Sequence, residues 1–381
     1  MRITFVNRLA GILWGGGESF DLEIARALTQ LGNYHIQFVI GRRWSRLDIP
    51  MTEFPATYVQ TPYLRWLQYR AHANDSRVLR RFGDRVSSLD LDMFERIALK
   101  KIVEDGIAEH TDVFQINGLP RLGAWLRQRL GVASVIIWHG PPGPEVQRWN
   151  KLCSATFTYG DSVAAVRENA DSRAVEISIG VDPVLFKRVP ADGLRKHYGI
   201  PMDAILCLFV GRMVPIKNLS FLIDAFALAL QHNPHLYLLL VGDGPCRPTL
   251  DQRINEYDLT GHVIFAGTQS GENLVAHYGA ADTFVITSTY DNSPFVVREA
   301  MACELPVIAT RVGGLPQLVE EGRTGLLVES GNVEQLKSAL LTIAKDKERR
   351  WEMGRCGREN VVHKYSWLQT AKQMVSLYQQ L

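Results

Sequence analysis

The chain has 381 residues, of which 46% are hydrophobic and 22% charged, and its formal net charge is +2. This length exceeds one ordinary core and suits two domains of roughly 150–200 residues each, while the near-neutral charge argues against the strongly basic surface of a nucleic-acid-binding protein. The five cysteines are scattered without C-x-x-C spacing, and no apolar run approaches the ~20 residues of a membrane span, so a disulfide framework, a zinc site and a membrane helix are disfavoured and a cytoplasmic location is favoured.

In the first half of the chain, short apolar strands alternate with helical segments. The pattern predicts strands at 3–7, 35–41, 112–116, 133–138 and 155–159, and helices at 18–31 and 119–129. Each strand is a continuous apolar run, which is typical of a parallel sheet covered by helices on both faces. Residues 42–110 interrupt this rhythm.

Two loops of the first half follow predicted strands. Gly15-Gly16-Gly17-Glu18 lacks the Gly-Lys-Ser/Thr end of a P-loop, so it indicates either close backbone approach to a ligand or a simple tight turn. His139 follows the strand at 133–138 beside Gly140, where we expect it to face a cleft. A lone histidine at such a position is more often structural.

A basic and aromatic segment spans residues 63–85, inside the interruption. It has a local excess of four positive charges, with Tyr63, Trp66 and Tyr69 interleaved among the arginines. This composition suits contact with an anionic membrane surface or an anionic acceptor. It also describes a solvated basic helix whose aromatic residues pack inward, and the sequence leaves both interpretations open.

The pattern restarts after Gly180-Val181-Asp182-Pro183, which we interpret as a hinge. Strands are predicted at 205–211, 236–242, 263–267, 283–288 and 306–310, and helices at 219–231 and 333–344. Each half of the chain therefore resembles a doubly wound α/β domain. Gly242-Asp243-Gly244-Pro245 is a turn by composition, and because no GxGxxG fingerprint follows it, a nicotinamide site is not supported.

The stretch 287–302 is the richest in chemistry. It follows an apolar strand and opens a helix near Phe295, so its loop lies where open α/β sheets bind ligands and its helix start can hold a diphosphate. Asp291 and Glu299 are eight residues apart and can contact different parts of one extended ligand, such as a sugar and a ribose. Arg212 and Lys217, which follow the strand at 205–211, suit a leaving diphosphate.

Taken together, these residues resemble the family-4-type retaining glycosyltransferases (glycosyltransferase group 1) of GT-B fold. The matching elements, in chain order, are the Gly15-Gly16-x-Glu18 loop, His139, the Gly180-Val181-Asp182 hinge, Gly211-Arg212-x4-Lys217, Val241-Gly242-Asp243-Gly244-Pro245, and Asp291-x7-Glu299 followed by Ala300-Met301-Ala302. The resemblance implies an α/β fold with two doubly wound Rossmann-like domains facing a cleft. Residues 1–180 would form the acceptor-side domain and 181–365 the donor-binding domain, and the helix at 366–381 would pack back on the first.

The resemblance also implies a role for each site residue. Glu299 would hold the ribose; Arg212 and Lys217 would hold the diphosphate. Asp291 would hold the donor sugar, and His139 would contact the sugar and acceptor from the other side. The implied catalytic residues are His139, Arg212, Lys217 and Asp291. The implied donor-binding residues are Gly15, Gly16, Gly211, Arg212, Lys217, Asn292, Ser293, Pro294, Phe295, Val296, Val297 and Glu299.

The implied activity is retaining, metal-independent transfer of a hexose from a UDP- or GDP-sugar, with no other cofactor. The implied acceptor is a glycan or lipid-linked glycan of cell-surface polysaccharide synthesis. Asp90-Leu91-Asp92, the only Asp-x-Asp, stands at the start of a helical stretch and is interpreted as structural. Two alternatives stay open: a degenerate homologue that serves as a binding or scaffold subunit, and a sugar-nucleotide 2-epimerase.

Three residues depart from the family pattern. Asp291 replaces a glutamate and is shorter by one methylene, which changes its reach towards a sugar. Glu304 replaces a frequent glycine, so its turn need not adopt a glycine-only conformation, and we expect its side chain to lie on the surface. Gln317 replaces an acid and removes one negative charge.

Overall fold

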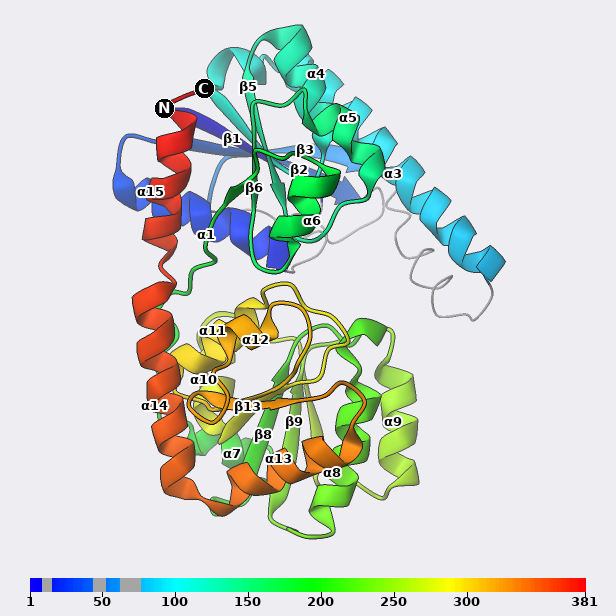
Figure 1. Ribbon diagram of the computed structural model, residues 1–381, viewed down its shortest axis with the longest axis vertical. Coiled ribbons are helices and arrows are strands. Elements are labelled where there is room, and N and C mark those ends of the chain that lie inside the picture. Colours follow the sequence, from blue (N-terminus) through cyan, green and yellow to red (C-terminus); the bar gives the residue numbers. More distant parts are fainter. Residues whose placement is uncertain (9–15, 44–52, 62–76) are drawn as a thin grey trace. The chain divides into compact units, whose positions relative to one another are not determined.

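The computed structural model describes residues 1–8, 16–43, 53–61 and 77–381, and these residues form two units. Unit 1 comprises Met1–Ile179 together with Trp367–Leu381, and unit 2 comprises Gly180–Ser366. The chain therefore crosses between the units twice, after Ile179 and after Ser366. Each unit is described below by itself (Figure 1).

Within the described residues of unit 1, seven parallel strands form one sheet in the order β3-β2-β1-β4-β5-β6-β7. The strands are β1 (Arg2–Asn7), β2 (His35–Arg43), β3 (Ala56–Thr61), β4 (Val113–Asn117), β5 (Ala133–Trp138), β6 (Ala155–Thr158) and β7 (Val175–Glu176). The helices include α1 (Gly16–Leu31), α3 (Arg77–Glu104), α4 (Pro120–Leu130), α5 (Gln147–Asn150), α6 (Ser162–Asn169) and α15 (Trp367–Tyr378). The interruption at 42–110 thus holds an edge strand, β3, and the long helix α3.

Unit 2, which is described throughout, has six parallel strands in the order β10-β9-β8-β11-β12-β13. The strands are β8 (Ile205–Val210), β9 (Leu236–Val241), β10 (Val263–Gly267), β11 (Thr283–Ile286), β12 (Val307–Thr310) and β13 (Gly325–Val328). The helices are α7 (Asp192–His197), α8 (Leu219–Leu230), α9 (Arg247–Glu256), α10 (Gly271–Ala280), α11 (Phe295–Ala302), α12 (Leu315–Leu318), α13 (Val333–Lys345) and α14 (Lys347–Lys364), with a 3-10 turn, η3, at Pro215–Lys217.

Both faces of the unit 2 sheet are covered by helices, which explains the unbroken apolar runs of its strands. Along β8, Leu208 packs with α10 and α11 on one face, while its neighbour Phe209 packs with α8 and α13 on the other. Successive side chains of a strand point to opposite faces, so a strand buried on both sides needs apolar residues at every position. The predicted α/β class with two Rossmann-like halves is confirmed.

The chain ends with α14 on unit 2 and α15 on unit 1 (Figure 1). The helix α15 packs against α1, and long-range hydrogen bonds fix it to the sheet region: Tyr378 donates to Gln115 Oε1, Thr370 to the Ser178 carbonyl and Gln373 to the Glu176 carbonyl (each 2.8 Å). In the part of the chain that the structure describes, no helix is both long and apolar enough to cross a membrane. The predicted contact through 63–85 lies outside the described residues, apart from the backbone of the first turns of α3, and stays a prediction.

Candidate functional site

The strand order of unit 2 reverses between β8 and β11, and the loops after these two strands lie side by side. Open α/β sheets bind ligands beyond the carboxyl ends of the strands at such a switch point. Several hydrogen bonds join the loops; among them, the Thr289 amide donates to the Ile216 carbonyl (2.8 Å), and the Thr287 hydroxyl donates to the Lys217 carbonyl (3.0 Å). The two motifs that the sequence separates by more than seventy residues thus form one surface.

Lys217 and Asp291 meet at this surface. Lys217 Nζ donates to Asp291 Oδ2 at 2.5 Å, and Ser288 Oγ donates to the same oxygen at 3.1 Å. The two side chains keep 19% and 15% of their surface exposed, so a ligand can reach the pair. Asp291 was predicted to hold sugar hydroxyls; here its Oδ2 is engaged by the lysine predicted to hold the diphosphate.

The backbone of Asp291 is held by the loop after β12. The Gly314 amide donates to the Asp291 carbonyl (2.9 Å), and a β-carbon on Gly313, which has a φ of +52°, would lie 2.1 Å from that carbonyl oxygen. Only glycine permits this approach. The Thr310 hydroxyl also donates to the Ser288 carbonyl (2.7 Å), so three successive loops of the sheet edge are joined.

Arg212 is exposed and leaves β8 beside the turn Gly242–Pro245. The Met213 amide donates to the Asp243 carbonyl (2.8 Å). A β-carbon on Gly242 would lie 2.0 Å from the Gly211 carbonyl oxygen, and Gly242 has a φ of +126°. The glycine turn therefore fixes the strand end from which Arg212 projects.

The helix α11 begins at Phe295, as the sequence predicts. Its N-cap residue, Pro294, makes no side-chain capping bond. The first amides of a helix carry the positive end of its dipole, so this start can accept an anion, although the Val297 amide already donates to the Pro294 carbonyl (3.3 Å). The predicted donor residues Asn292 to Val297 all lie on this loop and first turn; Asn292 and Val297 are buried.

Glu299 lies one turn further along α11 and has a partner that the sequence did not indicate. Tyr278, on α10, is fully buried and donates its hydroxyl to Glu299 Oε2 at 2.8 Å. Burial and the nearby carboxylate raise the pKa of Tyr278 well above its usual value, so the phenol stays a donor. A tyrosine on an apolar helix face needs a partner for its hydroxyl, and that was the available signal. Arg298, also missed, is buried on the same helix.

His139 belongs to unit 1, at the carboxyl end of β5. Its Nδ1 shares a hydrogen bond of 2.6 Å with the Tyr159 hydroxyl, and its ring meets Phe20 edge-on with centroids 5.4 Å apart. Burial lowers the pKa of His139 to about 3, so the imidazole is neutral at physiological pH. Gly15 lies outside the described residues, and Gly16 begins α1.

The Asp-x-Asp residues of unit 1 make ion pairs with arginines. Asp90 is buried and pairs with Arg8; Asp92 pairs with Arg96 and with Arg121. In the described ranges, no three His, Cys, Asp or Glu side chains gather as ligands of a metal ion.

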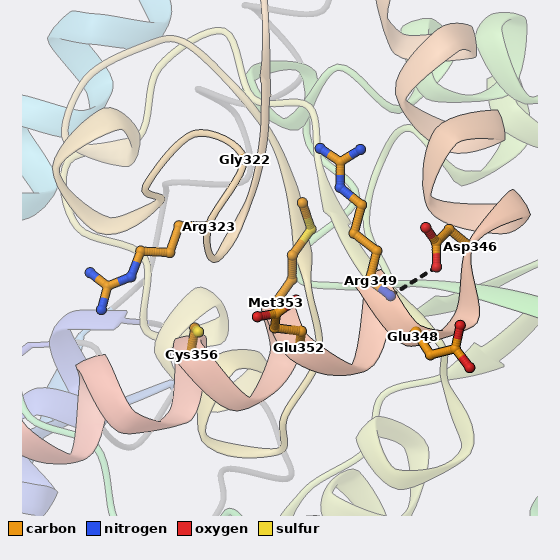
Figure 2. A pocket seen from close by; sticks show the side chains of 8 residues that line it. All are labelled: Gly322, Arg323, Asp346, Glu348, Arg349, Glu352, Met353 and Cys356. Atoms are coloured by element: carbon orange, nitrogen blue, oxygen red, sulfur yellow. Dashed lines mark hydrogen bonds between the residues drawn. The ribbon is translucent and has the colours of Figure 1, made fainter.

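A hollow of about 510 Å³ lies away from these loops, between the turn at Gly322 and the start of α14 (Figure 2). Its charged lining has both signs, with Arg323 and Arg349 among Asp346, Glu348 and Glu352. The Arg349 amide caps α14 by donating to Asp346 Oδ1 (2.9 Å). None of the predicted site residues lines the hollow, so the switch point remains the candidate site.

Comparisons with known proteins agree with this fold. Residues 191–360 match the model of the family "Glycosyl transferases group 1". The D-inositol 3-phosphate glycosyltransferase of Saccharomonospora viridis is 31% identical over 240 residues, which cover 61% of this chain and 56% of that protein. The N-acetyl-alpha-D-glucosaminyl L-malate synthase of Bacillus anthracis is 30% identical over 213 residues, which cover 56% of this chain and 55% of that protein. The chain thus spans about half the length of these curated relatives.

A solved structure, Anabaena HepE in complex with UDP and glucose, covers the whole of both chains with a TM-score of 0.80 and 20% identity. The likeness defines the fold as that of the GT-B glycosyltransferases. The predicted family is confirmed: residues 191–360 are a group 1 glycosyltransferase domain.

Proposed function

We propose that the chain is a retaining, metal-independent glycosyltransferase that moves a hexose from a nucleoside-diphosphate sugar, UDP- or GDP-linked, to an acceptor. The observation that carries the proposal is the meeting of Lys217, Asp291 and the start of α11 at the switch point of unit 2. A cation, a helix N-terminus and a neighbouring carboxylate suit the two ends of such a donor. The family of residues 191–360 supports the same reaction class.

Leaving-group stabilisation is the main chemical task of this site. The diphosphate gains negative charge as the sugar bond breaks, and Arg212, Lys217 and the amides of Val296 and Val297 would neutralise it. In the described structure Lys217 is engaged by Asp291. Donor binding would place the phosphates within reach of Lys217, and the Asp291 carboxylate would then turn to a sugar hydroxyl. Glu299, held by Tyr278, would accept hydrogen bonds from the ribose.

For the configuration to be retained without a covalent intermediate, the acceptor attacks from the face that the diphosphate leaves. The sugar–oxygen bond to the diphosphate breaks while the bond to the acceptor oxygen forms, and the departing phosphate takes the acceptor's proton. Neutral His139 would contribute hydrogen bonds rather than charge.

The acceptor that we propose is a glycan or lipid-linked glycan of surface-polysaccharide synthesis, with the protein in the cytoplasm at the inner face of the membrane. The basic segment at 63–85 motivates this choice. The relatives are named for D-inositol 3-phosphate and L-malate, so small anionic acceptors belong in the same assay panel.

The first test is a thermal-shift panel of UDP, GDP, ADP and dTDP, with their sugar conjugates and without metal. Saturation near 100 times Kd is worth ~2.7 kcal/mol, or about 5–10 °C in Tm for a domain of this size. Glu299→Gln should abolish most of that shift. Glu320→Gln, which changes an ion-paired glutamate of the same unit, should preserve it. If no nucleotide shifts Tm at millimolar concentration, the chain is not a donor-binding transferase and the scaffold alternative takes its place.

A further inference from the structure

The two segments through which the chain crosses between its units are joined to one another within unit 2. The Val181 amide donates to the Tyr365 carbonyl at 3.3 Å, and Val181 forms a parallel bridge with Ser366. Residues 180–186 and 365–366 are called the crossing segments below. In the first crossing segment, the Asp182 carboxylate accepts hydrogen bonds from the amides of Val184 (2.9 Å) and Leu185 (3.1 Å). These bonds make the segment an ordered turn.

Arg298 connects the candidate donor loop to the crossing segments. It is only 3% exposed, although it sits on α11 next to Glu299. Its Nη2 donates to Ser293 Oγ at 2.7 Å, and its Nη1 faces the carbonyls of Ser293 (3.4 Å) and Pro294 (3.5 Å). Its guanidinium carbon lies 4.6 Å from the centre of the Tyr365 ring. One planar group thus contacts both the loop before α11 and the second crossing segment.

Two further contacts anchor the same helix to the first crossing segment. Arg358, on α14, donates to the Ala302 carbonyl at the end of α11 and to the carbonyls of Phe186 (3.1 Å) and Pro183 (3.3 Å). The Phe186 ring also meets Tyr278 edge-on with centroids 6.0 Å apart, and Tyr278 is the residue that holds Glu299. Both ends of α11 and its carboxylate are therefore linked to the crossings.

We propose that Arg298 is a positioning residue that holds the Ser293–Pro294 loop for the donor and transmits the state of that loop to the crossing segments through Tyr365. The inference rests on the proposed function, because it takes α11 as the donor site. A guanidinium suits this task, since its planar fork bonds several acceptors while its face stacks on an aromatic ring. A buried charge with such contacts is costly to displace, so the loop and the crossings move together or not at all.

The test is hydrogen–deuterium exchange of the full chain, with and without saturating UDP or GDP. In the wild type, the nucleotide that binds should slow exchange at least threefold both at 291–297 and at the amides of 181–186. Tyr365→Leu removes the stacking face and should abolish the response at 181–186 while keeping the response at 291–297. Tyr365→Phe keeps the ring and should behave as wild type.

Substitutions at Arg298 separate positioning from folding. Arg298→Met should abolish both responses and raise the donor KM about tenfold, whereas Arg298→Lys should restore part of the loop response without the crossing response. Arg350→Met is the matched control: Arg350 is 8% exposed and donates to two carbonyls, of Ile343 and Ala344, away from α11. In the Arg350→Met variant, the nucleotide should still slow exchange at residues 181–186.

The outcomes distinguish the inference from the function beneath it. If a nucleotide binds and protects 291–297 in the wild type but leaves 181–186 unchanged, the inference is overturned and the proposed function stands. If Arg350→Met loses the crossing response as fully as Arg298→Met, Arg298 has no special role and the inference fails. If neither nucleotide binds, the proposed function fails and takes the inference with it.

Discussion

The same topological position is occupied differently in the two units. Each sheet has a switch point, between β1 and β4 in unit 1 and between β8 and β11 in unit 2. In unit 1, Asp21 is buried near this point and accepts from the Asn7 side chain (2.6 Å) and the Asn117 side chain (3.2 Å). In unit 2, Lys217 and Asp291 form an ion pair that keeps some surface exposed.

The fold supplies the position in both units, and the side chains at that position decide its use. In the described part of unit 1, the hydrogen bonds from Asn7 and Asn117 to the Asp21 carboxylate tie β1, β4 and α1 together. The unit 2 switch point presents the partly exposed Lys217–Asp291 pair, in which we propose that a ligand replaces the carboxylate as the partner of Lys217. Further along the unit 1 edge, His139 is neutral and paired with Tyr159. Under the proposed function, the charge-stabilising work would fall to unit 2 and neutral hydrogen bonding to unit 1.

The largest expected effect on turnover comes from removing the Lys217 ammonium group of unit 2. Lys217→Met should lower kcat by about 100–1000-fold, or ~2.7–4 kcal/mol, because one preorganised group that neutralises the leaving diphosphate is lost. The measurement is the rate of nucleoside-diphosphate release with the donor that the thermal-shift panel selects. Lys337→Met is the control, since Lys337 is similarly buried (21% exposed) and paired with Glu334 in the same unit. A kcat of Lys217→Met within threefold of wild type would contradict the assignment of leaving-group stabilisation to the unit 2 switch point.

A second prediction tests the neutrality of His139 in unit 1. The folded pKa of about 3 lies below the ordinary 6.5, so the unfolded state binds a proton first as pH falls. The resulting stability is fully present above pH 6.5 and is lost progressively as pH falls towards 3. Between pH 7.5 and 5, wild type should lose about 2 kcal/mol more than His139→Gln.

The readout is the difference between the two proteins in urea titrations at both pH values. The difference between the two proteins is needed because Glu95 also titrates in this range. Burial raises the pKa of Glu95 to about 7, so this carboxyl gains its proton first in the folded state. Its protonation therefore stabilises the fold as pH falls, which is opposite to the effect of His139. Equal losses in wild type and His139→Gln would mean that the imidazole is charged or exposed, and unit 1 would then also present a titrating cation.

The sequence allowed the framework of unit 2 to be predicted closely because its signals are local. The apolar run of β10 and the starts of α8 at Leu219 and α11 at Phe295 lie where the pattern placed them. The edge strand β3 (Ala56–Thr61) was not predicted, because half of its residues are polar and no continuous apolar run marks it.

The side-chain contacts of the candidate site could not be predicted from the sequence, for a different reason. Lys217 and Asp291 are brought together by the pairing of β8 with β11, and strand order is not written in either motif. The partners of Glu299 and Ser293 are Tyr278 and Arg298, which read in the sequence as ordinary helix residues. Their roles follow from burial, because a buried polar group must find a partner.

Glu304 shows the opposite failure, a local signal that was misread, and it gives the smallest predicted effect. The substitution indicated that this turn need not adopt a glycine-only conformation, with the side chain on the surface; in the structure its φ is nevertheless +61° and the residue is half-buried. The amide of Glu304 donates to Met301 and that of Leu305 to Ala300 (both 3.0 Å), which is the bonding pattern of a helix end closed by a left-handed residue. A β-carbon on Gly354 of α14 would lie 2.0 Å from the Glu304 carbonyl oxygen, so the turn has no room to relax.

The left-handed conformation costs a residue with a β-carbon about 1 kcal/mol, so Glu304→Gly should be more stable than Glu304→Ala by that amount. The alanine variant is the control because it removes the charge but keeps the β-carbon. In a unit of this size the gain should appear as about 2–4 °C in Tm. Because α11 stays in place, the nucleotide-induced thermal shift should be unchanged in both variants. If the glycine variant is no more stable than the alanine one, the left-handed turn is not the source of the cost. If the glycine variant is more stable but its Tm no longer responds to nucleotide, the strained turn at the end of α11 is needed for donor binding. Unit 2 would then differ from unit 1 in backbone strain as well as in the charges at its switch point.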